Sequence, residues 1–150
     1  MIRLKLMRQT STITFYRADD STGLALPFAD GGIRAGFPSP AQDYMDLTLD
    51  LNKELIKHPA ATFYGRVKGD SMKDAGISDG DILVIDRSLD WQDGMTAVCF
   101  VDGEFTVKTI RRQDGKILLM PANADYAPIE VTPENEFVIW GIVTYVIKKM

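Results

Sequence analysis

The chain has few of the residues that build disulfide frameworks and histidine-based catalytic sites. Its 150 residues include one cysteine, Cys99, and one histidine, His58. A single cysteine excludes an intrachain disulfide and suits a reducing compartment. Cys99 lies in an apolar run, which predicts a small buried side chain and not a nucleophile. His58 precedes Pro59 and is therefore expected in an extended loop. We interpret it as structural or solvated, with a Ser-His-Asp triad as the alternative.

Long apolar segments and an excess of positive charge are also absent. The longest largely apolar run, residues 137–147, is much shorter than the roughly 20 residues of a membrane-spanning helix. Charged residues interrupt the apolar ones at the N-terminus, so no signal sequence is expected. These features predict a cytoplasmic protein without membrane attachment. The chain carries 17 basic and 21 acidic side chains. We therefore expect protein partners and no direct sequence-specific DNA binding.

Turn and strand signals dominate the chain after residue 61. Segments rich in β-branched and aromatic residues are separated by Gly, Asp and Pro turns. Asp102-Gly103 and Asp114-Gly115 have the sequence of two-residue hairpin turns. Strands are predicted at residues 62–68, 81–86, 95–101, 104–110, 116–120 and 136–148. The pattern predicts one compact, mainly β domain with largely antiparallel strands.

The N-terminal part carries weaker signals. In residues 1–38 we expect one strand at 12–16, followed by a stretch rich in Gly, Asp and Ala that we interpret as a mobile arm. Residues 39–42, Ser-Pro-Ala-Gln, have the form of a helix start. Leucines then alternate at strand period from Leu47 to Leu51, before a brief helical turn expected over residues 51–57.

Ser71 and Lys108 form a candidate nucleophile and base. A serine hydroxyl is a poor nucleophile until a neighbouring base takes its proton, and an amine serves if an apolar site holds it neutral. Ser71 lies in the turn Gly69-Asp70-Ser71-Met72, and Lys108 lies among apolar neighbours in the strand predicted at 104–110. Burial of that strand would lower the pKa of Lys108. Either residue alone would more often be structural, as a turn serine or an edge-strand lysine.

A pair of small residues, Ala35-Gly36, lies upstream of this constellation. Attack on a peptide carbonyl inside a fold needs an extended substrate with little bulk at the cut, and Ala and Gly provide that. Pro38 disfavours helix just beyond. Three aspartates, Asp74, Asp79 and Asp81, lack the spacing of a calcium loop and are interpreted as turn residues. We therefore expect no metal site.

These motifs, in this order, resemble the LexA/UmuD family of self-cleaving serine-lysine peptidases (peptidase family S24), and within it the UmuD branch. The resemblance runs from about Gly36 to the C-terminus. It is carried by residues 36–41, 69–72, 76–81 and 102–108. It implies a LexA/UmuD-type β-fold with short helices and a flexible N-terminal arm.

The resemblance assigns roles to individual residues. Ser71 would be the nucleophile and Lys108 the general base, and the scissile bond would be Ala35-Gly36. The backbone N–H groups of Asp70 and Ser71 would bind the oxyanion, a role that their place in a tight turn also suits. Self-cleavage would remove residues 1–35 from a peptidase domain of residues 36–150. No cofactor is implied.

The resemblance also implies partners. The shortened form would be a homodimer that serves as accessory subunit of a Y-family (UmuC-like) translesion DNA polymerase in the bacterial SOS response to DNA damage. A RecA-DNA filament would promote cleavage. The apolar strand predicted at 136–148 independently favours a dimer, because such a strand should not remain at a bare sheet edge.

Two alternatives from other functional classes remain. One is a LexA-like transcriptional repressor, although residues 1–35 are short for a DNA-reading domain. The other is a non-catalytic interaction module on the same fold. Retention of both Ser71 and Lys108 weighs against that module, and an activity measurement decides between them.

Overall fold

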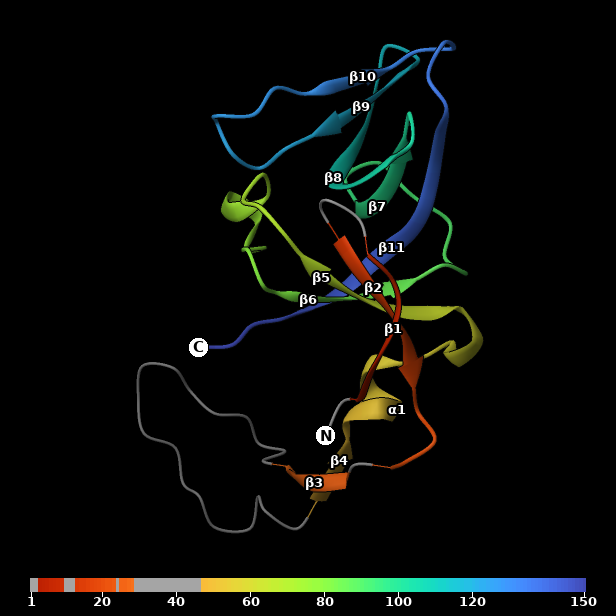
Figure 1. The fold of residues 1–150 in the computed structure, drawn as a ribbon, viewed down its shortest axis with the longest axis vertical. Helices are drawn as coiled ribbons and strands as arrows, with labels where there is room; N and C mark the ends of the chain where they lie inside the picture. Colours follow the sequence, from red (N-terminus) through yellow and green to blue (C-terminus); the bar gives the residue numbers. More distant parts are fainter. Residues whose placement is uncertain (1–2, 10–12, 24, 29–46) are drawn as a thin grey trace.

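Most strands of the molecule belong to one antiparallel sheet (Figure 1). The computed structural model describes residues 3–9, 13–23, 25–28 and 47–150. The strands are β1 (Arg3–Gln9), β2 (Ile13–Asp19), β3 (Ala25–Phe28), β4 (Leu47–Asp50), β5 (Thr62–Val67), β6 (Ile82–Asp86), β7 (Thr96–Val101), β8 (Glu104–Gln113), β9 (Lys116–Met120), β10 (Ile129–Val131) and β11 (Phe137–Ile147). The mainly β fold class is confirmed.

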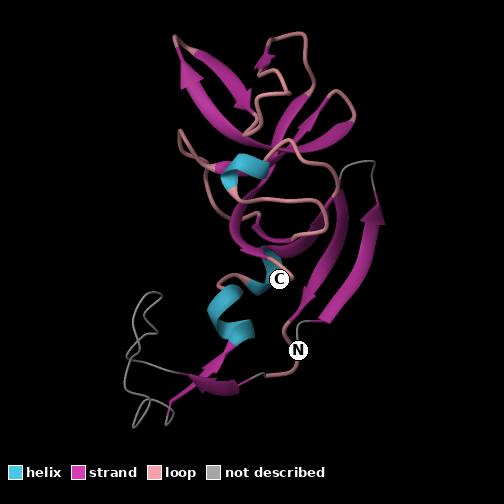
Figure 2. Ribbon diagram, turned by 90° about the vertical axis from the view of Figure 1, so that its left-hand side faces the viewer, coloured by secondary structure: helices cyan, strands magenta, loops and turns pink. Residues whose placement is uncertain are grey.

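Within these residues, nine strands form the large sheet in the order β1-β2-β5-β6-β11-β7-β8-β9-β10. The long strand β11 joins its two halves, because it pairs with β7 through Phe137 to Ile142 and with β6 from Ile142 onward. The separate β3–β4 pair lies at the opposite end of the molecule from β9 and β10 (Figures 1 and 2).

Helices are short in the described ranges. They are α1 (Leu51–Leu55) and the 3-10 turns η1 (Pro59–Ala61) and η2 (Lys73–Ala75). Asp50 caps α1, because its carboxylate accepts a hydrogen bond from the Asn52 N–H at 3.0 Å. The brief helical turn predicted after Leu51 is therefore confirmed. No helix in these ranges is long and apolar enough to cross a membrane.

The strands predicted after residue 61 are confirmed within a few residues, with β8 longer than expected. The Asp102-Gly103 hairpin turn is confirmed too: both residues have positive φ, 47° and 90°, as a two-residue turn between twisted strands requires. Strands β1, β3 and β10 are not predicted by the sequence pattern. β3 contains Pro27, which cannot donate a ladder hydrogen bond, and β10 has only three residues.

The largest buried cluster lies around three aromatic rings. The Phe15 ring centroid is 4.9 Å from that of Phe105 and 4.7 Å from that of Trp140. A second cluster contains Cys99 and Ile110. Burial raises the pKa of the Cys99 thiol to about 12. Cys99 is therefore a small buried hydrophobic side chain, as predicted.

The interpretation of residues 1–38 as a mobile arm needs correction for β1 and β2. The predicted strand at 12–16 exists as β2, but it pairs with β1 on one side and with β5 on the other. Ile13 and Phe15 are 1% and 2% exposed, so β2 is held by burial as well as by hydrogen bonds. The expected helix start at 39–42 lies outside the described residues.

Candidate functional site

The structure brings Ser71 and Lys108 together from distant parts of the chain. Ser71 lies in the turn between β5 and η2, and Lys108 lies in the middle of β8. The Lys108 Nζ and the Ser71 Oγ are hydrogen bonded at 2.9 Å. Sequence spacing alone does not fix such a contact, because the two residues meet only through the pairing order of the sheet.

The neighbours of Lys108 in the sheet leave room for its side chain. Lys108 pairs with Ala97 of β7, whose methyl group occupies little space. Thr106 lies two residues earlier, on the same face of β8. Besides the Ser71 hydroxyl, the Lys108 Nζ contacts the Thr106 Oγ1 at 2.7 Å and the Val107 carbonyl at 3.1 Å. The amine therefore has three defined polar partners.

Burial governs the ionisation of Lys108. The residue is 6% exposed, and it belongs to none of the ion pairs found in the described part of the chain. Loss of hydration disfavours the ammonium and lowers the pKa of Lys108 below its ordinary value. A Cys99 thiolate would oppose this shift, but the high pKa of Cys99 keeps that thiol neutral near physiological pH.

The turn around Ser71 is fixed by hydrogen bonds to its peptide groups. The Asp70 carbonyl accepts from the Lys73 N–H at 3.1 Å and from the Asn123 Nδ2 at 2.9 Å. The Ser71 carbonyl accepts from the Ala122 N–H at 2.8 Å. The peptide groups on both sides of Ser71 are thus held in place. Within the described residues no hydrogen bond engages the N–H of Asp70 or Ser71, which leaves both donors available.

A groove of about 480 Å³ opens beside the two side chains. Ser71, Thr106 and Lys108 contribute to its wall, together with Tyr126 and Ile129 from the segment around the start of β10. The Tyr126 hydroxyl donates to the Asp70 Oδ1 at 2.8 Å, and this hydrogen bond raises the pKa of Tyr126. An open groove with a hydroxyl, an amine and free N–H groups has the parts that acyl transfer needs.

Comparison with known proteins places this chain in a family. The Peptidase S24-like family model matches residues 27–144. The chain belongs to this family. It is 45% identical over 122 residues to protein MucA of Salmonella typhimurium, covering 81% of the chain and 83% of MucA. It is 44% identical over 128 residues to protein ImpA of Escherichia coli, with 81% and 82% covered. It is 38% identical over 120 residues to the LexA repressor of Hahella chejuensis, with 74% and 60% covered.

The family resemblance expected from the motifs is therefore confirmed, and the S24 match contains both Ser71 and Lys108. Ala35 and Gly36 lie outside the described residues, so the predicted cleavage site stays a prediction. The catalytic roles also stay predictions, although the contact that they require is present. Sequence reasoning missed Asn123, whose only signal was its place in a polar turn.

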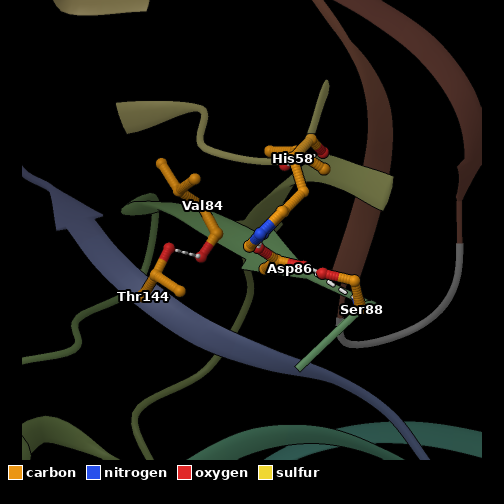
Figure 3. Close-up of polar contacts among 6 residues, drawn as sticks. His58, Val84, Asp86, Ser88 and Thr144 are labelled. Carbon is orange, nitrogen blue, oxygen red and sulfur yellow. Dashed lines mark hydrogen bonds and ion pairs between the residues drawn. The ribbon is translucent and has the colours of Figure 1, made fainter. Parts of the chain in front are cut away.

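His58 belongs to a different site. Its Nδ1 lies 2.5 Å from the Asp86 Oδ2, and the Ser88 hydroxyl donates to the Asp86 Oδ1 at 2.6 Å (Figure 3). In a Ser-His-Asp triad the serine would instead contact the far ring nitrogen of the histidine. No hydroxyl of the described residues does so, and His58 does not line the groove of Ser71. The alternative triad is therefore not formed in the described structure.

Proposed function

We propose that this S24 family member is a self-cleaving serine peptidase with Ser71 as nucleophile and Lys108 as general base. The observation that carries the proposal is the 2.9 Å contact between the Ser71 hydroxyl and a buried amine that has no ion-pair partner in the described residues. Asp70 and Ser71 contribute the oxyanion donors through their backbone N–H groups.

The three partners of Lys108 explain how it acts as a base. A neutral amine has two N–H bonds and one lone pair. The Thr106 hydroxyl and the Val107 carbonyl, at 2.7 and 3.1 Å, accept the two N–H bonds, and the lone pair is left for the Ser71 hydroxyl proton. Burial favours the neutral form that this arrangement needs.

The reaction then proceeds in two balanced steps. The Ser71 Oγ attacks the Ala35 carbonyl as its proton passes to the Lys108 Nζ, and the resulting oxyanion accepts hydrogen bonds from the two backbone N–H groups. The carbon-nitrogen bond to Gly36 breaks as Lys108 returns the proton to the departing amine. Water, deprotonated by Lys108, hydrolyses the ester and restores Ser71. The peptide bond between the segments 1–35 and 36–150 is thereby cut.

We further propose the cellular role that the resemblance implies. The processed protein acts in the cytoplasm as a homodimer, as accessory subunit of a Y-family, UmuC-like translesion polymerase in SOS mutagenesis, and the RecA-DNA filament promotes its processing. The similarity to MucA and ImpA supports this role. In the structure β11 pairs with β6 on one side and β7 on the other, so the argument from a bare sheet edge does not apply. Exposed Val138, Tyr145 and Val146 on this strand support the dimer instead. Sedimentation showing only monomer at micromolar concentration would exclude the dimer.

A LexA-like repressor is a less favoured function. The described residues before position 29 form strands and offer no recognition helix. A sequence-selective, high-affinity DNA complex at physiological salt would favour it over the proposed role.

A mass-resolved time course tests the proposed cleavage. The purified chain is incubated from about pH 7 to about pH 10, below the ordinary lysine pKa of about 10.4. We expect fragments that end at Ala35 and begin at Gly36, formed faster as pH rises. Gly36→Val should slow the reaction without unfolding the body, because the branched side chain adds bulk at the cut. Fragments from another bond, or normal processing of folded Gly36→Val, would reject this cleavage site.

A further inference from the structure

The hairpin of β1 and β2 lies before the family match but inside the fold. The S24 match begins at residue 27, whereas β2 ends at Asp19. Even so, β2 pairs with β5 in the large sheet from Ile13 opposite Val67 to Arg17 opposite Phe63. Figure 2 shows β1 and β2 side by side along one flank of the molecule. The hairpin is thus part of the sheet although it precedes the residues that the family model matches.

Burial of β2 extends into the centre of the molecule. The Phe15 ring packs against Phe105 of β8 and Trp140 of β11. Ile13 belongs to the same buried cluster. Removal of β2 would expose these apolar surfaces to water and would leave the backbone of β5 as an unpaired edge. Both effects oppose departure of the hairpin.

The shape of β5 fits the hairpin at Gly65. This glycine pairs with Phe15 in the interior of the strand. A Cβ atom at position 65 would lie 3.0 Å from the Ile13 Cγ2 and 3.0 Å from the Ile85 Cδ1, closer than most real Cβ contacts. Glycine in a strand interior commonly marks a close approach of this kind. Glycine at position 65 therefore leaves room for the Ile13 side chain, which a larger residue at this position would displace.

Ile13 also approaches the candidate site. It lines a cavity of about 30 Å³ together with Ser71, Thr106 and Val67. One wall of the space beside the serine is therefore supplied by a residue that lies upstream of the proposed scissile bond. Loss of the hairpin would remove that wall.

We propose that the β1–β2 hairpin stays bound to β5 after the chain is cut between Ala35 and Gly36. Self-cleavage then yields a nicked domain of two associated chains instead of a body that has lost residues 1–35. The sheet and the wall beside Ser71 persist, and the change is a new N-terminus at Gly36. The cut rests on the proposed function, whereas the association rests on the packing of β2 alone.

The first test compares denaturing and native mass measurements on the processed protein. Denaturing conditions should show the two fragments, and native conditions at micromolar concentration should show one species with their combined mass. Native separation of the fragments would overturn the inference. Phe15→Ala should increase dissociation of the small fragment, whereas Thr22→Ala, at an exposed position of the same fragment, should not. Thermal unfolding of both uncut variants confirms that each is folded.

A second test separates this inference from the proposed function. A site for a sequence-specific protease is inserted after Ala35 in the Ser71→Ala chain, so that cutting no longer depends on the serine. Retention of the fragment in this protein supports the inference even if the natural chain never cleaves itself, and separation rejects it. Hydrogen exchange on the uncut chain gives an independent check. We expect β2 amides to exchange as slowly as those of β5, and exchange at the rate of an unstructured peptide would contradict the inference.

Discussion

At two sites of this molecule a serine hydroxyl contacts a buried titratable side chain. That side chain is a lysine at the first site and an aspartate at the second. At the first, the Ser71 hydroxyl contacts the amine of Lys108. At the second, the Ser88 hydroxyl donates to the carboxylate of Asp86, which also contacts His58 (Figure 3). The second site has all three residue types of a serine protease triad. The first has the geometry of a nucleophile and its base.

The difference lies in which partners surround the buried group. Burial alone would raise the pKa of Asp86, but hydrogen bonds from Ser88 and His58 lower it below its ordinary value. The carboxylate therefore stays charged as an anchor. Burial also disfavours the charged form of Lys108, and there no anion among the described residues compensates. Desolvation opposes the charged form at both sites, but hydrogen bonds outweigh it at Asp86, whereas at Lys108 it lowers the pKa.

The largest expected effect comes from removing either member of the first site. Ser71→Ala should abolish self-cleavage because no nucleophile remains, and Lys108→Ala should slow it by about 10²–10⁴-fold, the usual contribution of a general base. His58→Ala should leave the rate unchanged. Intact mass over time measures all three. Undiminished cleavage in Lys108→Ala would refute the mechanism, and loss of cleavage in folded His58→Ala would transfer the base role to the second site.

A carboxylate placed beside Lys108 should make the first site resemble the second. Thr106→Asp replaces a hydroxyl that lies 2.7 Å from the Nζ. An adjacent anion raises the lysine pKa, by about 1–3 units for close pairs, so cleavage at neutral pH should slow about 10–1000-fold and recover at higher pH. Thr106→Asn, of equal size and without charge, is the control. Identical pH profiles of the two variants would show that charge does not govern the base.

Removal of the anion from the second site should affect stability and leave cleavage unchanged. Asp86→Asn weakens the hydrogen bonds from Ser88 and His58, at a cost of about 1–3 kcal/mol in the free energy of unfolding. Because the pKa of Asp86 is lowered in the folded protein, the stability that it contributes is present above its ordinary pKa and is lost as pH falls through the folded value. Urea unfolding at neutral and acidic pH measures both effects.

Two outcomes would contradict this separation of roles. The exposed variant Asp90→Asn should unfold like the unmodified protein, and an equal loss of stability there would show that general charge is responsible. A fall in the cleavage rate of folded Asp86→Asn would connect the two sites, which line different grooves.

The strands and the serine-lysine pair could be predicted because their signals are local or are ordered motifs. Alternating apolar residues and the Asp102-Gly103 turn predict β7 and β8, and the order of the motifs points to Ser71 and Lys108. The contact itself depends on the path of the sheet between them.

The remaining features depend on partners far away in the sequence. Ile13 and Phe15 predict a strand, but the sequence does not show that their partner is β5, about fifty residues later. Asn123 reaches the Asp70 carbonyl only through the fold, and the same holds for His58 and Asp86. Side-chain hydrogen bonds of this kind have no periodicity along the chain, so pattern reasoning does not find them.

Replacement of Lys108 by an uncharged side chain should have the smallest effect, a change in the stability of the fold. The pKa of Lys108 in the folded chain is lower than the ordinary lysine value of 10.5. At pH values between these two pKa values, the unfolded chain therefore binds a proton that the folded chain does not. Stability contributed by this group therefore rises with pH across that interval. Lys108→Met, unbranched and uncharged, should remove this pH dependence and stabilise the fold at neutral pH by on the order of 1 kcal/mol, the scale of an ordinary single substitution. Thermal unfolding across that pH range measures the change. A destabilised Lys108→Met protein would show that the charged amine, like the Asp86 carboxylate, anchors the fold.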